Sequence, residues 1–130
     1  MEHDIFVVDS NVFVAFYNEN DEHHADAVAV MRELAGNTLI VHPYVIQEVA
    51  TVLTYRFGIA TAKKFLTDIK NADDVILPTV DITRDIEHFI AADKKISFTD
   101  AALVILAISM NASLLTFDRQ MLSLMKKKKG

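Results

Sequence analysis

Short, mostly apolar runs alternate along the chain with longer stretches that mix apolar and polar residues. Each short run is bounded by polar residues, and this pattern predicts strands that are buried on both faces. The predicted strands cover residues 5–8, 38–41, 75–77 and 114–117. Buried strands separated by helices indicate a parallel sheet, because parallel neighbours need crossover connections.

Between these runs, apolar residues recur at helical spacing. The predicted helices cover residues 12–16, 25–34, 45–57, 60–69, 82–92, 97–110 and 119–125. Gly36 and Gly58 follow two of them as helix stops, and Pro43 falls in a first helical turn, where its missing N–H is not needed. We therefore expect an α/β fold: one three-layer α/β/α domain over residues 1–125, with a mostly parallel sheet of four to five strands and a basic C-terminal tail at 126–130.

The composition fits one compact domain. The chain has 130 residues, of which 52% are hydrophobic and none is cysteine, so thiolate catalysis, cysteine-ligated zinc and disulfides are excluded. The longest apolar run, Ala101 to Ile108, has eight residues, whereas a membrane span needs about 20. The start, Met1-Glu2-His3-Asp4, is acidic where a secretory signal would be basic. We expect a cytoplasmic protein with no membrane partner.

The net charge is unusual for a protein that binds polyanions. The chain carries 13 Lys and Arg against 18 Asp and Glu, a net charge of −5, and four of the cations form the run Lys126 to Lys129. Without that run, nine cations face 18 anions, a balance of −9. No basic stripe is visible in the sequence, so nucleic-acid binding would need positive charge from a divalent metal or from a partner.

Two aspartates directly follow predicted strands. Asp9 follows the run 5–8, and Asp118 follows the run 114–117. The carboxyl ends of parallel strands are where sites form in open α/β sheets. Each residue could equally be a helix N-cap, a role that aspartate favours.

Two further acids lie on predicted helices. Glu48 lies at the edge of an apolar stripe, where we expect it to be largely shielded from water; it could instead be a rim glutamate that is paired with Arg56 or Lys63, or is simply solvated. Asp100 has capping-box spacing from Ser97 and also faces the core side of its helix. If all four acids converge, their mutual repulsion would require cations, and the all-oxygen cluster would suit Mg²⁺ or Mn²⁺.

These acids and their surroundings resemble those of PIN domains. The segments that carry the resemblance are Val7-Val8-Asp9-Ser10-Asn11-Val12-Phe13, Val45-Ile46-Gln47-Glu48-Val49, Ser97-Phe98-Thr99-Asp100-Ala101 and Leu115-Thr116-Phe117-Asp118. Their order and spacing agree with the family, and the resemblance covers essentially the whole chain. A single-domain chain of this length is most similar to the VapC-type toxins of type II toxin–antitoxin pairs.

The resemblance implies a ribonuclease that uses Mg²⁺ or Mn²⁺ and hydrolyses RNA by in-line attack of a metal-activated water. The implied catalytic and metal-binding acids are Asp9, Glu48, Asp100 and Asp118. Asp9 and Asp100 are expected to be direct ligands, and the other two to act directly or through metal-bound water. Side chains that would orient these carboxylates, or serve only as turn and cap residues, are Asn11, Ser97 and Thr116. The implied partners are an RNA substrate, a cognate antitoxin and a second copy of the chain in a homodimer.

Two other functions remain open at this point. A haloacid-dehalogenase-like phosphatase also places an Asp after its first strand, but it expects a second Asp two residues later, where this chain has Asn11. A PIN fold without catalysis could serve as a partner-binding module, although the presence of all four acids argues against it.

Some conspicuous residues are expected to carry no chemistry. We assign His23 and His24 to a solvated turn. The aromatic residues Phe13, Phe16 and Tyr17 could be core or partner surface.

Overall fold

The computed structural model describes residues 4–129. Within them, four strands form one parallel sheet in the order β3-β2-β1-β4. The strands are β1 (Ile5–Val8), β2 (Thr38–Ile40), β3 (Val75–Ile76) and β4 (Ser113–Leu115). The parallel sheet confirms the prediction from the apolar runs. Since β1 lies between β2 and β4, the end of β1 is flanked by the ends of two neighbouring strands.

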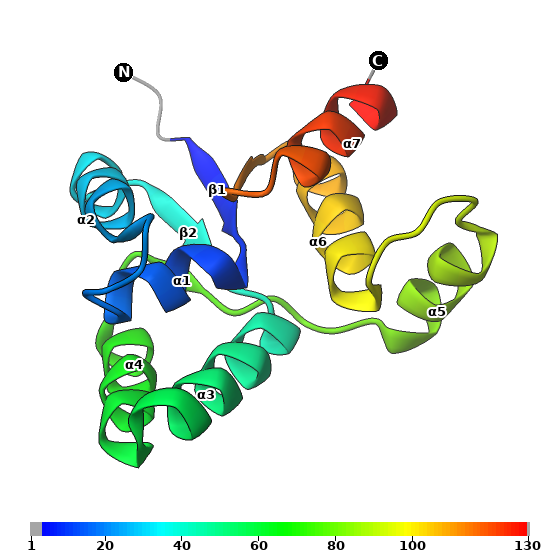
Figure 1. The fold of residues 1–130 in the computed structure, drawn as a ribbon. Coiled ribbons are helices and arrows are strands. Elements are labelled where there is room, and N and C mark those ends of the chain that lie inside the picture. Colours follow the sequence, from blue (N-terminus) through cyan, green and yellow to red (C-terminus); the bar gives the residue numbers. More distant parts are fainter. Residues whose placement is uncertain (1–3, 130) are drawn as a thin grey trace.

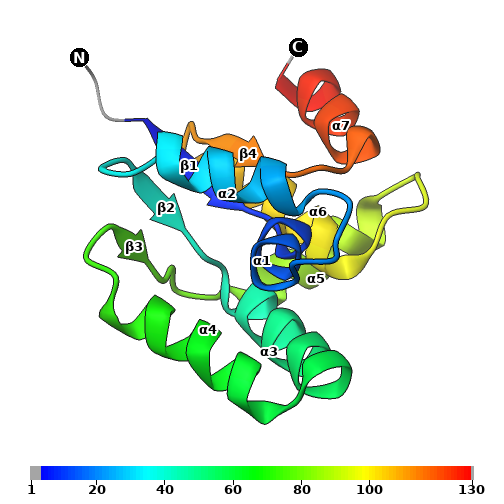
Figure 2. The same ribbon diagram turned by 60° about the vertical axis from the view of Figure 1, so that its left-hand side comes forward.

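Helices cover both sides of this sheet. They are α1 (Ser10–Tyr17), α2 (His24–Glu33), α3 (Pro43–Phe57), α4 (Ile59–Asn71), α5 (Ile82–Ala91), α6 (Phe98–Ser109) and α7 (Arg119–Lys129). Helices α1 to α4 lie on one side and α5 to α7 on the other, with α6 packed against β1 and β4 (Figures 1 and 2). The predicted three layers are therefore present. None of the helices within residues 4–129 has the length and apolar character needed to cross a membrane.

The C-terminal part of the chain differs from the prediction at two points. Strand β4 covers Ser113–Leu115, whereas the prediction was 114–117, so Thr116 lies just after the strand. Helix α7 continues through Lys129, four residues beyond the predicted helix end at 125, so residues 126–129 are helical; residue 130 lies outside the described residues. The helix persists because Met121 and Met125 are buried in the core and anchor one of its faces.

The aromatic residues near the first helix belong mainly to the core. Phe13 is buried and packs against Phe65, with ring centroids 5.2 Å apart. Tyr17 packs edge-on against the same ring at 5.7 Å, and its hydroxyl donates a hydrogen bond to Asp68 at 2.5 Å. Phe16, half-buried, lies 5.1 Å from Tyr17. These contacts join α1 to α4, so the core alternative holds for this cluster.

Candidate active site

The central feature of the site is the junction between the ends of β1 and β4. Asp9, which is 4% exposed, extends the strand pairing because its backbone N–H donates to the Leu115 carbonyl at 2.9 Å. Its Oδ1 accepts a hydrogen bond from the Ser10 N–H at 2.7 Å, and its Oδ2 accepts one from the Thr116 hydroxyl at 2.8 Å. Asp9 is thus the N-cap of α1, as expected, and also a buried carboxylate held by specific donors.

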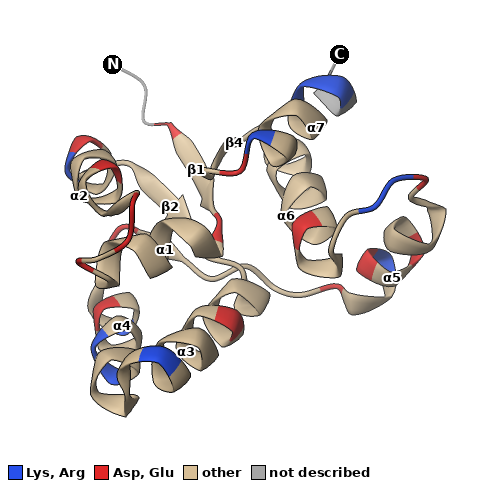
Figure 3. Ribbon diagram, viewed as in Figure 1, with Lys and Arg blue, Asp and Glu red and all other residues tan. Residues whose placement is uncertain are grey.

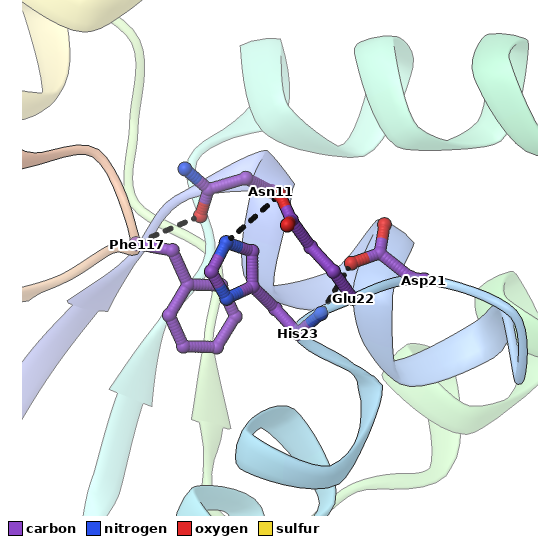
Figure 4. A network of polar contacts seen from close by, with 5 residues as sticks. All are labelled: Asn11, Asp21, Glu22, His23 and Phe117. Atoms are coloured by element: carbon purple, nitrogen blue, oxygen red, sulfur yellow. Dashed lines mark hydrogen bonds and ion pairs between the residues drawn. The ribbon is translucent and has the colours of Figure 1, made fainter.

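Asn11 and Thr116 connect the two strand ends. The Asn11 amide donates to Thr116 Oγ1 at 3.0 Å, while its Oδ1 accepts from the Phe117 N–H at 3.2 Å (Figure 4). The Asp118 N–H also donates to Thr116 Oγ1, at 3.0 Å. Asp118 in turn caps α7, because its Oδ1 accepts from the backbone of Gln120 at 2.8 Å. These bonds set the relative positions of the Asp9 and Asp118 backbones.

Asp100 comes to the site from the start of α6. The Ser97 hydroxyl accepts the Asp100 N–H at 3.0 Å, so Ser97 is the predicted N-cap. Burial and then the negative charges of Asp9, Asp118 and Glu48 together raise the pKa of Asp100 to about 6, while a hydrogen bond from Ser97 opposes the rise. The Asp100 carboxyl group is therefore close enough to the other three acids for their charges to change its pKa.

Glu48 is the most solvent-exposed of the four acids. It lies on α3 and is exposed, so the expectation that it is largely shielded from water is wrong. Partial desolvation still raises its pKa, and the charge of Asp9 adds to the rise, whereas a hydrogen bond from Ser10 opposes it. Within the described residues, no ion pair joins Glu48 to Arg56 or Lys63. Glu48 therefore faces the other acids rather than a cation.

The donor set fits a hard divalent cation in chemistry, although the side chains are spread apart. All four groups offer carboxylate oxygens, the ligands that Mg²⁺ and Mn²⁺ prefer. Among residues 4–129, no three Asp, Glu or His side chains lie close enough together to hold one ion. Asp9 and Asp118 also use carboxylate oxygens in hydrogen bonds within the protein.

The loop before α2 contributes a contact that the sequence did not reveal. The ring of His23 stacks on Phe117, with centroids 4.8 Å apart and planes 18° apart, and its Nε2 lies 3.5 Å from a Glu22 oxygen (Figure 4). The His24 ring Nδ1 lies 2.8 Å from the Ala15 carbonyl oxygen. Residues 21–23 do form a turn and the His23 side chain is 43% exposed, so the expectation of a solvated turn holds in part. The contacts with Phe117 and with the Ala15 carbonyl were not predicted, because these groups are not sequence neighbours of the two histidines.

A second polar network adjoins the end of β2. His42, which is 4% exposed, caps α3 by accepting the Tyr44 N–H on Nδ1 at 3.0 Å. The Tyr44 hydroxyl donates to Asp85 Oδ2 at 2.9 Å, and Asp85 is 5% exposed. Tyr44 also contacts the ring of Phe98, at 5.7 Å between centroids, next to the Ser97 cap. Asp85 lies one helical turn before Phe89 on α5, and this spacing was an available signal that it faces inward.

A cavity of about 980 Å³ opens beside Asp100 and Asp118. Its lining includes four cations: Lys94, Lys95, Arg119 and Lys127. They come from the loop before α6 and from both ends of α7, and their backbone segments lie around the same side of the molecule (Figure 3). The sequence shows no basic stripe because these residues are brought together only by the fold.

Comparison with known proteins adds the family. The model of the PIN domain family matches residues 6–127. A search of curated proteins finds no significant match. Among solved structures, the VapC20 toxin of Mycobacterium tuberculosis, described as a sarcin–ricin loop cleaving toxin, superposes with a TM-score of 0.77 at 22% identity, over 92% of this chain and 94% of that one. That similarity shows a shared fold. Because the PIN model covers nearly the entire sequence, the chain belongs to the PIN domain family.

Proposed function

We propose that this chain is an endoribonuclease that hydrolyses RNA phosphodiester bonds with the help of Mg²⁺ or Mn²⁺. The observation that carries the proposal is the environment of Asp100, whose pKa is raised by its burial and by the charges of Asp9, Asp118 and Glu48. Such repulsion is costly in the free protein and is relieved by a cation. Membership of the PIN family supports the same conclusion.

The four acids would hold the cation in different ways. Asp9 and Asp100 are the proposed direct ligands. Thr116 holds the Asp9 carboxylate at the carboxyl end of β1, and the charges of the other three acids act on Asp100. Asp118 uses Oδ1 to cap α7, so its second oxygen would act directly or through a bound water, as would the exposed Glu48.

A bound divalent ion would lower the pKa of a coordinated water from about 15.7 toward neutrality and would stabilise charge on the phosphate. The chain's own part is to hold that ion and to keep the carboxylates in place. Asn11 and Thr116 fix the strand ends, and Ser97 fixes the start of α6. No protein nucleophile is needed, because water is the attacking group.

The biological role that fits best is the toxin of a type II toxin–antitoxin pair acting in the cytoplasm. The fold shared with VapC20 over nearly the full length of both chains supports this role. A cognate antitoxin and a second copy of the chain are the proposed partners. Large apolar side chains that stand exposed offer surface for them, including Tyr55 at 86% and Ile59 at 62% near the α3–α4 corner and Ile90 at 77% on α5.

Incubation of the purified chain with total RNA, with Mg²⁺ or with a chelator, tests the proposal. We expect cleavage only with the metal, and none by Asp9→Asn or Asp100→Asn. Asp26→Asn, which changes an exposed acid on α2, is the matched control and should cleave like the wild type. Full activity of either site variant, or equal cleavage in the chelator, contradicts the assignment.

A non-catalytic PIN module is the alternative, and metal binding separates the two. Mn²⁺ should raise the melting temperature of the wild type and leave that of Asp100→Asn unchanged, because a ligand stabilises only the state that binds it. A wild type that neither binds Mn²⁺ nor cleaves RNA would be a partner-binding module. The match to the PIN family counts against the haloacid-dehalogenase-like phosphatase, whose second aspartate is replaced by Asn11.

A further inference from the structure

We propose that the cavity beside Asp100 and Asp118 is the path of the RNA strand, and that Lys94 and Lys127 clamp one backbone phosphate whose base enters a neighbouring apolar pocket. This inference rests on the proposed ribonuclease function. It goes further by naming the side of the site on which the substrate lies and the residues that hold it.

The first support is the charge of the cavity. The lining of the cavity includes the cations Lys94, Lys95, Arg119 and Lys127 together with the acids Asp100 and Asp118. A phosphodiester strand needs cations along its length, whereas the reacting phosphate needs a divalent ion at the acids. The cavity offers both in one continuous space. In a chain with a net charge of −5, such a concentration of cations is a local exception.

The second support is the closeness of two ammonium groups. The neighbouring ammonium group of Lys94, in the loop before α6, lowers the pKa of Lys127 on α7, and both lysines line the cavity. Both side chains are exposed. Two cations held near each other are unfavourable in the free protein, and a bridging anion removes the repulsion. A backbone phosphate is an anion of this kind and could accept hydrogen bonds from both groups.

The third support is a smaller pocket that shares lining residues with the basic cavity. Its volume is about 210 Å³, and Lys94, Ile96, Leu124 and Lys127 line both spaces. The rest of its lining is largely apolar, with Ala101, Val104 and Ile105 from α6 among the residues. A nucleotide has the matching chemistry, since its phosphate is anionic and its base has flat apolar faces. Unstacked bases of single-stranded RNA are commonly bound in this way.

An RNA occupant accounts for more of these observations than a protein segment does. An apolar peptide would explain the small pocket but not the four cations that continue toward the acids. An RNA strand explains the small pocket, the paired lysines and the path to the acids together. The protein alternative is therefore an outcome of the test below.

The test measures binding without cleavage. The probe is a fluorescent, single-stranded 2′-O-methyl RNA of random sequence, which lacks the free 2′-hydroxyl, titrated into the full chain in the presence of a chelator. We expect Lys94→Gln with Lys127→Gln to weaken binding about ten-fold at 0.1 M salt and to lower the slope of log affinity against log salt by about 0.7, since the pair holds one phosphate and each lost phosphate contact removes about 0.7. The matched control is Lys63→Gln with Lys70→Gln, two exposed lysines on α4, which should change binding less than two-fold.

A second arm tests the base pocket. Ala92 lines the pocket and is exposed, so Ala92→Leu should fill the pocket without disturbing the core. The wild type should bind the intact oligonucleotide several-fold more tightly than an abasic one, and this preference should disappear in Ala92→Leu. A preference that survives the substitution overturns the pocket assignment.

The outcomes separate this inference from the proposed function. Equal effects of the two lysine pairs, or no effect of either, overturn the clamp, while Mg²⁺-dependent cleavage that is lost in Asp100→Asn would leave the ribonuclease assignment standing. If the wild type cleaves RNA but the variant with both Lys94→Gln and Lys127→Gln binds RNA as tightly as the wild type, the clamp is wrong and the cations are assigned to a protein partner.

Discussion

The Thr116 hydroxyl donates a 2.8 Å hydrogen bond to Oδ2 of Asp9, across 107 positions of sequence. Thr116 Oγ1 also accepts hydrogen bonds from the Asn11 amide and from the Asp118 N–H, both at 3.0 Å. A hydroxyl has one hydrogen to donate and two lone pairs, so this one is fully used. A single small side chain thus ties the end of β1, the start of α1 and the start of α7 together.

Thr116→Val should therefore destabilise the protein. The substitution keeps the shape but leaves the buried Asp9 carboxylate and two N–H donors without their partner, at an expected cost of about 1–3 kcal/mol in the free energy of unfolding. Urea unfolding in the presence of a chelator measures it. Thr116→Ser retains the hydroxyl and should lose less than about 1 kcal/mol. Equal stability of the valine and serine variants would show that the hydroxyl network does not contribute.

Asp100→Asn should have the opposite effect on the metal-free chain. The pKa of Asp100 is raised from 3.8 to about 6 in the folded state, mainly by burial and then by Asp9. The ionised form is thus disfavoured by folding; the resulting cost develops as pH rises from about 4 to 6 and is fully present above pH 6. Removing the charge should stabilise the chain at pH 8 by about 1 kcal/mol, a value reduced by solvent screening, and should have little effect near pH 4.

Thermal unfolding in a chelator at the two pH values measures this difference. Asp26→Asn, at an exposed position on α2, is the control and should show no comparable gain. If Asp100→Asn is less stable than the wild type at pH 8, the acids do not repel one another as the structure indicates.

The cap formed by His42 should make stability depend on pH. Burial lowers the pKa of His42 below its ordinary value of 6.5, with Asp85 opposing and Arg84 adding to the effect. Below pH 6.5 the unfolded chain binds a proton that the folded chain resists, so this contribution to stability is complete above pH 6.5 and is lost as pH falls. Protonation of Nδ1 would also break the hydrogen bond from the Tyr44 N–H.

His42→Asn provides the comparison, since asparagine is a good N-cap but does not titrate. We expect the wild type to lose about 1 kcal/mol more than the variant between pH 7.5 and pH 5.5. Denaturant unfolding at both pH values measures the two losses. Parallel pH dependence in the two proteins would assign the sensitivity to other groups.

Tyr44→Phe should reveal the cost of an unpaired buried acid. Its hydroxyl donates to Asp85, which is 5% exposed, and burial together with this hydrogen bond raises the pKa of Tyr44 to about 12. Loss of the donor should lower the free energy of unfolding by about 1–3 kcal/mol. Tyr55→Phe is the matched control because Tyr55 is 86% exposed, and it should be nearly neutral. Similar values for the two variants would mean that Asp85 finds another partner.

Much of the fold is determined by local pattern. Continuous apolar runs such as Ile5 to Val8 can be buried only in a covered sheet, and the glycines and Pro43 mark helix boundaries through backbone geometry. The caps Asp9 and Ser97 were predictable for the same reason, since a capping side chain bonds to the backbone one to three residues away. The extension of the last helix into the lysine run was not predicted, because that helix depends on burial of Met121 and Met125 against distant elements.

The sequence by itself determined the parallel α/β layers, the placement of two acids after strands and two on helices, and their resemblance to the PIN family. Only the tertiary structure decided which groups meet. It brought Thr116 to Asp9, stacked His23 on Phe117, paired Tyr44 with a buried Asp85 and gathered four cations around one cavity. The reason is physical: periodicity and capping act over a few residues, whereas contacts between distant segments depend on how the sheet and its helices pack.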